Sequence, residues 1–318
     1  MSSAQLGFSL DDGPVVAAPA EGRFDHLAAL PAGVFLGTSS WAFPGWQGLL
    51  YDRDWPAKVL SRQGLAAHAA QPWLRSASID RAFYGPLAAA EYRHYASQVG
   101  PDFRFVVKTW QALTEPRTEG QRNRNFLSPA QVQTRVINPA LEGAGDRIGQ
   151  LLVQFSPGAC RLFERHRVLF DERLATLLRG IDTGPAQVVV EVRSPRLFDE
   201  NFLALLREHE AIPCLTVHSA MAPLATQWAL VRRSEPPALS LRWNLGHGRG
   251  YEAAKRDYAP FNRLVAEDQD TRAVVVDAIR FALDAGIPAT VIANNKAEGC
   301  APLTLARVAE ALLEHEEN

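Results

Sequence analysis

Eight short apolar segments, separated by longer stretches with helical periodicity, constrain the fold of this chain more than any other feature. The predicted strands are Val34–Ser39, Arg75–Asp80, Phe103–Lys108, Gln150–Phe155, Gln187–Arg193, Pro213–His218, Leu239–Asn244 and Ala289–Ala293. Amphipathic helices are predicted over Pro56–Ala70, Leu162–Leu178, Arg272–Ala285 and Leu303–Leu313. Repeated strand–helix alternation indicates a parallel sheet with helical crossovers, and eight strands are the number that closes a barrel.

The competing fold is an open, doubly wound sheet, which favours a Gly-x-Gly-x-x-Gly turn after an early strand. The sequence contains no such turn. The 318 residues lie within the range of one α/β barrel, roughly 200 to 400 residues, and 47% of them are apolar. We therefore predict an α/β fold, a single (β/α)8 TIM-type barrel over residues 33–318. Residues 1–32 lack clean periodicity and are predicted to form a loose N-terminal arm.

Composition excludes several classes of protein. The 33 Lys and Arg residues are balanced by 35 Asp and Glu, so a formal net charge of −2 gives no global positive field for nucleic acid or acidic lipid. No apolar run approaches the roughly 18 residues of a membrane span, and the first residues lack the pattern of a secretory signal. Cys160, Cys214 and Cys300 are far apart and odd in number, which favours a reducing cytoplasm.

Charged side chains at predicted strand ends are the strongest functional signal, because catalytic groups of parallel barrels lie at the carboxyl ends of the strands. In the fifth segment, alternation places Glu191 and Arg193 on one face and Val188, Val190 and Val192 on the other. We expect the valines to contact the helices and the charged residues to point into the barrel mouth. A buried structural ion pair is the alternative interpretation.

Other segments end in polar residues as well. Lys108 closes the third segment and is a candidate for binding an anion or, if burial lowers its pKa, for acting as a base. Arg242 is a second inward cation, on the seventh segment. The remaining candidates for substrate binding are Gln154, Asp80, Tyr84, Trp41, Asn294 and Asn295. For the cations, a structural role or a solvated strand end is the alternative.

Together these residues predict a polar pocket for a small anionic or sugar-like ligand. We expect Lys108, Glu191, Arg193, Arg242 and one asparagine of the 294–295 pair to converge within about 12 Å, because the strands that carry them end at one rim. One carboxylate cannot neutralise three cations, so the pocket is expected to carry a positive potential.

Two neighbouring features leave alternatives open. The loop over residues 115–125 carries Arg117, Arg122 and Arg124 and is either a basic lid or a solvated loop. The aromatic residues that follow the first segment either stack on a ring-shaped ligand or pack across the barrel mouth. They are Trp41, Phe43, Trp46 and Tyr51.

Signals for a metal or a cofactor are weak. The eight histidines are scattered, and the sequence holds no HExxH, no His-x-His and no Gly-x-Ser-x-Gly motif. We predict no cofactor and no tightly bound transition metal.

The ordered set of motifs resembles the YecE-like family, domain of unknown function 72. The matching pieces are Leu-Gly37-Thr-Ser-Ser-Trp41 with Trp46 and Tyr51, Phe83-Tyr84, Val-Val-Lys108, Leu113-Thr114, Gln154-Phe-Ser-Pro157, Glu191-Val-Arg193, Arg242, Tyr251, Tyr258, and Asn294-Asn295 followed by Ala301-Pro302. They recur in family order over nearly the whole chain. The resemblance implies a TIM-type barrel and brings no established reaction or cofactor.

The chain departs from the family pattern at two places. The family usually has a Glu two residues before its Asn on the second strand, where this chain has Ser78 and Asp80. The family's seventh strand typically reads Arg-x-His-Gly, where this chain continues from Arg242 to Asn244 and Leu245. A mechanism that needs that Glu or that His is therefore not expected here.

The leading hypothesis is an enzyme of unassigned reaction. Glu191 is then the general acid/base, acting more readily as a base beside cations, with Lys108 as the second catalytic residue. Arg193 and Arg242 bind or polarise the substrate. Metal-assisted phosphodiester cleavage, by analogy with barrel endonucleases, is one alternative, although nucleic acid is a poor match to the net charge. A non-catalytic protein that binds a ligand or partner is the other, and the sequence makes no prediction of oligomeric state.

Overall fold

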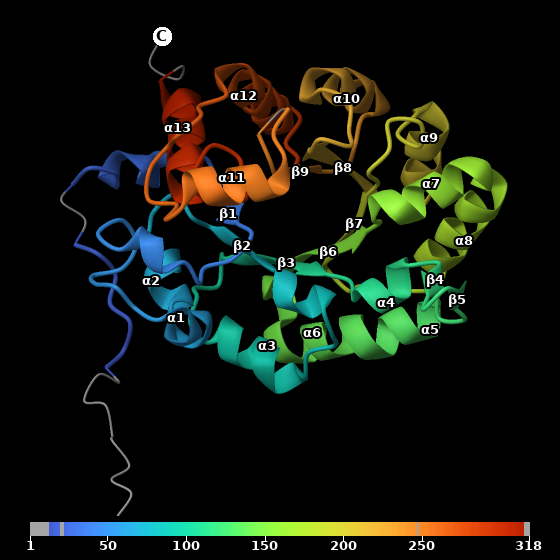
Figure 1. Ribbon diagram of the computed structural model, residues 1–318, viewed down its shortest axis with the longest axis horizontal. Coiled ribbons are helices and arrows are strands. Elements are labelled where there is room, and N and C mark those ends of the chain that lie inside the picture. Colours follow the sequence, from blue (N-terminus) through green and yellow to red (C-terminus); the bar gives the residue numbers. More distant parts are fainter. Residues whose placement is uncertain (1–12, 20–21, 247, 315–318) are drawn as a thin grey trace, which may run out of the picture.

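Eight parallel strands close into a barrel in the computed structural model of the chain, in which residues 13–19, 22–246 and 248–314 are described (Figure 1). The strands are β1 (Val34–Thr38), β2 (Ser76–Ile79), β3 (Arg104–Lys108), β6 (Ile148–Gln154), β7 (Gln187–Glu191), β8 (Ile212–Val217), β9 (Leu239–Trp243) and β10 (Ala289–Ala293). They follow one another around the barrel in chain order, and β10 pairs with β1. Each predicted segment overlaps one of these strands, so the predicted barrel is confirmed.

Helices surround the barrel (Figure 1). They are α1 (Ala57–Gln63), α2 (Leu65–Ala69), α3 (Ala89–Ala96), α4 (Gln111–Thr114), α5 (Pro129–Val132), α6 (Asn138–Ala144), α7 (Pro157–Arg165), α8 (Arg167–Arg179), α9 (Glu200–Glu208), α10 (Leu224–Val231), α11 (Tyr251–Tyr258), α12 (Gln269–Asp284) and α13 (Ala301–Leu313). None of the helices in the described part of the chain is long and apolar enough to span a membrane.

Two of the predicted helices are each divided in the structure. The first is interrupted at Gly64, between α1 and α2. The second begins earlier than predicted, at Pro157, because the Ser156 hydroxyl caps it by accepting from the Ala159 amide. It breaks at His166, whose φ of −131° and ψ of 49° are not helical. The apolar periodicity runs on through His166, so the pattern could not reveal the corner between α7 and α8.

The segment predicted to form a loose arm is attached to the barrel wherever it is described. Residues 1–12, 20 and 21 lie outside the described residues. In the remainder, the Ala18 amide donates to the Leu50 carbonyl and the Asp52 amide donates to the Val16 carbonyl. Leu27, in a short 3-10 helix over Asp25–Ala29, is fully buried. Apolar side chains without helical or strand periodicity therefore fix this segment, which periodicity alone could not show.

The interior of the barrel confirms the alternation along β7. Val189 packs with apolar residues of neighbouring strands, whereas Val190 and Val192 belong to the larger core shared with the helices. A buried hydrogen bond from Ser240 Oγ to Gln150 Oε1, 2.9 Å long, crosses the interior. The same side of β7 carries Glu191 into the barrel mouth.

The contact between β1 and β2 requires glycine at position 37. A Cβ there would overlap the Ser76 carbonyl oxygen and lie 2.7 Å from the Ser76 Cβ. We therefore expect Gly37→Ala to lower the free energy of unfolding by about 1–3 kcal/mol, the usual cost of overpacking. Denaturant unfolding of Gly85→Ala is the control, because its Cβ would meet nothing within 4 Å. Equal stability of the two variants would contradict the expected clash.

Candidate functional site

A buried carboxylate held by two arginines forms the centre of the barrel mouth. Glu191, at the end of β7, is fully buried. Its Oε1 accepts from Arg193 Nε at 2.8 Å, and its Oε2 accepts from Arg242 Nη1 at 2.6 Å. The same Nη1 donates to Oε1 of Gln154 at 2.8 Å. The ends of β6, β7 and β9 therefore meet in one hydrogen-bonded group.

The protonation state of Glu191 follows from these contacts. Burial alone would raise its pKa, but the charges of Arg242 and Arg193 outweigh burial and lower the pKa to about 2. The carboxylate is therefore ionised at neutral pH, and both of its oxygens are occupied. Such a group exchanges protons poorly near pH 7. This geometry favours a positioning role, in which Glu191 holds the two arginines, over the acid/base role expected from the sequence.

Lys108, at the end of β3, is more weakly paired than Arg193 and Arg242. Its Nζ lies 3.8 Å from Asp80 Oδ2 and 4.0 Å from the centre of the Phe83 ring. Burial lowers the pKa of Lys108 to about 8 despite the nearby Asp80. Asp80 also lies 3.7 Å from Arg242 Nη2, and its Oδ1 accepts from Ser78 Oγ at 2.6 Å. Ser78, one of the two departures from the family pattern, thus orients the carboxylate between Lys108 and Arg242.

We name these five ionisable residues the mouth cluster: Asp80, Lys108, Glu191, Arg193 and Arg242. Three cations and two carboxylates leave it with one net positive charge. Among the described residues, Arg242 Nε and Asn244 Nδ2 are buried donors without a hydrogen-bond partner, and no hydrogen bond forms from Lys108 Nζ. The unfilled capacity belongs to donors, so the site is suited to a ligand that accepts hydrogen bonds.

His218, which follows β8, contacts the cluster and was not among the predicted site residues. Its Nε2 lies 3.1 Å from Arg193 Nη1, and its Nδ1 accepts from the Ala220 amide at 3.0 Å. A neutral imidazole accepts at only one nitrogen, so these two N–H groups compete for it. Burial and the charge of Arg193 lower the pKa of His218 to about 4. Its position directly after a strand was the available signal in the sequence.

The lowered pKa of His218 predicts a pH-dependent stability. Between pH 6.5 and about 4 the unfolded chain binds a proton at this position that the folded chain does not, so stability falls as pH falls through this range. We expect His218→Gln to reduce the loss of stability between pH 7 and pH 4.5, measured by urea unfolding. His68, whose pKa burial lowers to about 3, contributes a loss of the same sign that this variant retains. If the unfolding free energy of His218→Gln falls with pH as steeply as that of the wild type, the neutral state of His218 is contradicted.

The two asparagines after β10 have separate roles. Asn294 Nδ2 donates to Ser39 Oγ, at the end of β1, at 2.8 Å. Asn295 Oδ1 accepts from the Ala301 amide at 2.8 Å and thereby caps α13, a structural role. No hydrogen bond in the described part of the chain joins either side chain to the mouth cluster. The neighbouring Lys296, absent from the predicted site, is 7% exposed and its Nζ lies 4.3 Å from the centre of the Tyr251 ring.

The aromatic candidates differ in their burial. Tyr84 is 80% exposed and its ring contacts Phe83 edge to face. Trp41 is buried, packs edge to face on Tyr95, and its carbonyl accepts from the Tyr51 hydroxyl. Trp46 and Tyr51 are fully buried. For Trp41, Trp46 and Tyr51, the structure supports packing rather than stacking on a ligand.

Potential metal ligands do not gather in the described residues: no three of their His, Cys, Asp or Glu side chains form a group able to hold a metal ion. His247, one of the two histidines near predicted strand ends, lies outside the described residues.

Comparisons with known proteins place the fold. The family model described as "Protein of unknown function DUF72" matches residues 35–318. A DUF72 family protein from Thermotoga maritima has a TM-score of 0.57 and 17% identity, covering 88% of this chain and 99% of that chain. One from Enterococcus faecalis has a TM-score of 0.55 and 18% identity, covering 88% and 95%. SacUVDE, at a TM-score of 0.45 and 9% identity, supports no functional argument. The curated proteins contain no match.

Proposed function

The chain belongs to the DUF72 family of proteins of unknown function, and from the geometry of its barrel mouth we propose that it is an enzyme acting on a small anionic substrate. Lys108 transfers the proton in this proposal, and Arg193 and Arg242 bind the anion. The barrel fold places these side chains at the end of the strands where parallel barrels bind substrates.

One observation carries the proposal: the unfilled hydrogen-bonding capacity at the mouth belongs to donors. Arg242 Nε is buried without a partner, and Lys108 Nζ lies 3.8 Å from Asp80 Oδ2, beyond hydrogen-bonding distance. A buried donor without an acceptor costs about 1–3 kcal/mol, which an acceptor oxygen of a ligand would recover. The net positive charge of the cluster favours an anion over a neutral sugar.

The roles of the other residues follow from their contacts. Glu191 fixes the orientation of both arginines, since each of its oxygens is bonded to one of them. Asp80 accepts from Ser78 and lies within 4 Å of both Lys108 and Arg242, so it limits the positive charge of the mouth cluster. With a pKa of about 8, Lys108 is a mixture of amine and ammonium just above neutral pH and exchanges protons readily there. The buried thiols of Cys160, Cys214 and Cys300, which are all free, support a cytoplasmic location as part of the proposal.

A thermal-shift screen of small phosphorylated and carboxylated compounds tests this proposal. We expect a subset of them to stabilise the wild-type protein and to lose that effect in Lys108→Met. Lys58→Met, which removes an exposed lysine on α1, is the matched control and is expected to respond like the wild type. The proposal is overturned in favour of a structural cluster if no compound loses its stabilising effect in Lys108→Met. It is overturned in favour of the metal-dependent alternative if only divalent metals stabilise the protein.

A further inference from the structure

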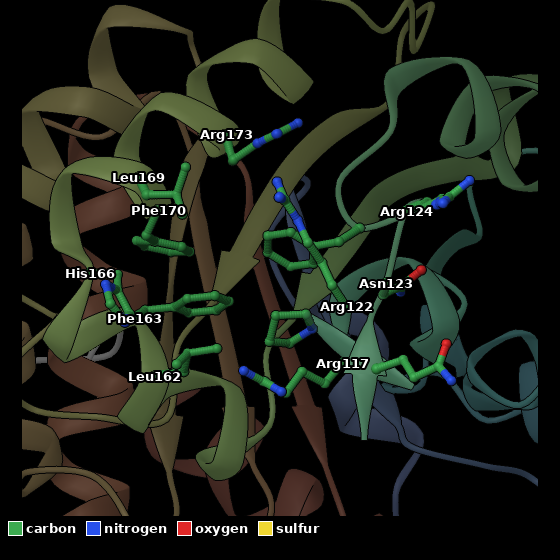
Figure 2. Close-up of a pocket in the computed structure, with 13 residues that line it drawn as sticks. Arg117, Arg122, Asn123, Arg124, Leu162, Phe163, His166, Leu169, Phe170 and Arg173 are labelled. Atoms are coloured by element: carbon green, nitrogen blue, oxygen red, sulfur yellow. The ribbon is translucent and has the colours of Figure 1, made fainter. Parts of the chain in front are cut away.

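A second site lies outside the barrel mouth, where the loop after β3 folds against the helices that follow β6. The loop forms the two-stranded hairpin β4 (Arg117–Thr118) and β5 (Gln121–Arg122). Between this hairpin and the corner of α7 and α8 is a cavity of about 820 Å³ (Figure 2). The three arginines of the loop line it and the hairpin is folded, so the loop is an ordered wall of a cavity. It shares no lining residue with the mouth cluster.

The charge on this cavity is one-sided. Arg117, Arg122 and Arg124 line it from the loop and Arg173 lines it from α8, while its walls include no Asp or Glu. In the described part of the chain no carboxylate lies within 4 Å of these four guanidinium groups, and one hydrogen bond, from Arg117 to the Gly120 carbonyl, engages them. Figure 2 shows Arg117, Arg122 and Arg173 extending into the space between hairpin and helices, with Arg124 turned away.

The floor of the cavity is apolar. Phe126 and Phe163 lie with ring centres 5.5 Å apart, and Phe163 stacks on Phe170 at 4.4 Å. Leu169 remains 50% exposed at its edge. The helix breaks at His166, and residues in the first two turns of α8 then form part of this floor.

From these features we propose that the cavity binds a small organic phosphate with the chemistry of a nucleoside di- or triphosphate. Guanidinium groups from β4, β5 and α8 line different parts of the cavity, which suits the several oxygens of a polyphosphate better than one planar carboxylate. A volume of about 820 Å³ exceeds what a phosphate fills and lies within the range of small-molecule sites. The apolar floor accommodates the flat base. This site is independent of the function proposed for the barrel mouth.

Isothermal titration with ATP in the presence of EDTA tests the proposal, with inorganic triphosphate, adenosine and a 20-nucleotide single strand as comparison ligands. We expect ATP to bind more tightly than triphosphate or adenosine. Arg173→Ser should weaken ATP binding about tenfold or more, the range for one charge-assisted hydrogen bond. Arg179 is an exposed arginine of the same helix that does not line the cavity, so Arg179→Ser should change the affinity for ATP by no more than about twofold.

The apolar floor of the cavity is tested by a matched pair of variants. Leu169→Ser should weaken ATP binding and leave triphosphate binding unchanged. Val168 is 72% exposed and does not line the cavity, so Val168→Ser should change the binding of neither ligand. The proposal is overturned if ATP does not bind, if Arg173→Ser and Arg179→Ser have equal effects, or if the single strand binds more tightly than ATP. The last result would identify the surface as a nucleic-acid contact.

Discussion

Glu191→Gln is expected to lower the free energy of unfolding by about 3–5 kcal/mol, the usual cost of leaving a buried ion pair half-removed. Glutamine keeps the shape of the side chain but removes the charge, and Arg242, 3% exposed, cannot reach solvent to compensate. Equilibrium denaturation at pH 7 measures the loss. The slopes of unfolding free energy against denaturant concentration are compared between the variants to exclude a change of unfolding mechanism. Glu142→Gln is the control, since its 3.5 Å pair with Arg93 is exposed on both sides and contributes about 0–1 kcal/mol.

A double variant shows whether the destabilisation comes from the unpaired charge of Arg242 or from lost packing around Glu191. In Glu191→Leu combined with Arg242→Met both buried charges are removed, and the remaining Arg193, 15% exposed, can turn toward water. We expect this variant to be more stable than Glu191→Gln. A loss below about 1 kcal/mol in Glu191→Gln itself would show that the carboxylate is not ionised between the arginines.

Lys108→Met is expected to weaken binding of the anion found by the thermal-shift screen by about tenfold to a hundredfold at pH 7, the range for a charged hydrogen bond. In the wild type, affinity should fall as pH rises through about 8, because the ammonium then loses its proton. Lys108→Arg should keep its affinity through this range. Titration calorimetry between pH 7 and pH 9.5 measures all three proteins.

Rate measurements over the same pH range distinguish an enzyme from a binding protein. If Lys108 acts as a base, the rate constant of turnover should rise with pH while the affinity falls, since only the neutral amine accepts a proton. The rise is expected above pH 8, because a bound anion that favours the ammonium raises the pKa of Lys108 in the complex. A protein that only binds shows the fall in affinity alone. Affinity that is independent of pH in all three proteins would contradict the role given to Lys108.

The sequence predicted the barrel and much of the ion-pair geometry because both depend on short-range regularities. Alternation along β7 determines that Glu191 faces inward, where Arg193 just after the strand pairs with it, and parallel strands bring Lys108 and Arg242 to the same rim. The sequence also indicated an ionised Glu191 beside cations, but it did not predict that both carboxylate oxygens are occupied. That depends on which oxygen each arginine reaches, and a strand pattern does not contain that information.

Other features lie in loops, where periodicity carries no information. Asn294 and Asn295 are adjacent, yet one contacts Ser39 and the other caps α13, because a turn sends their side chains in different directions. For the same reason, the contacts of His218 with Arg193 and of Lys296 with Tyr251 were not predicted. The corner at His166 is invisible in the apolar pattern, and it creates one wall of the arginine-lined cavity.

A crystal structure of the protein with an anion whose stabilising effect depends on Lys108 would show directly whether the barrel mouth binds it. We expect an acceptor oxygen within about 3.2 Å of both Lys108 Nζ and Arg242 Nε, with the bonds from Glu191 to Arg193 and Arg242 retained. Density for the anion in the cavity beside Arg173, with the barrel mouth unchanged, would contradict it.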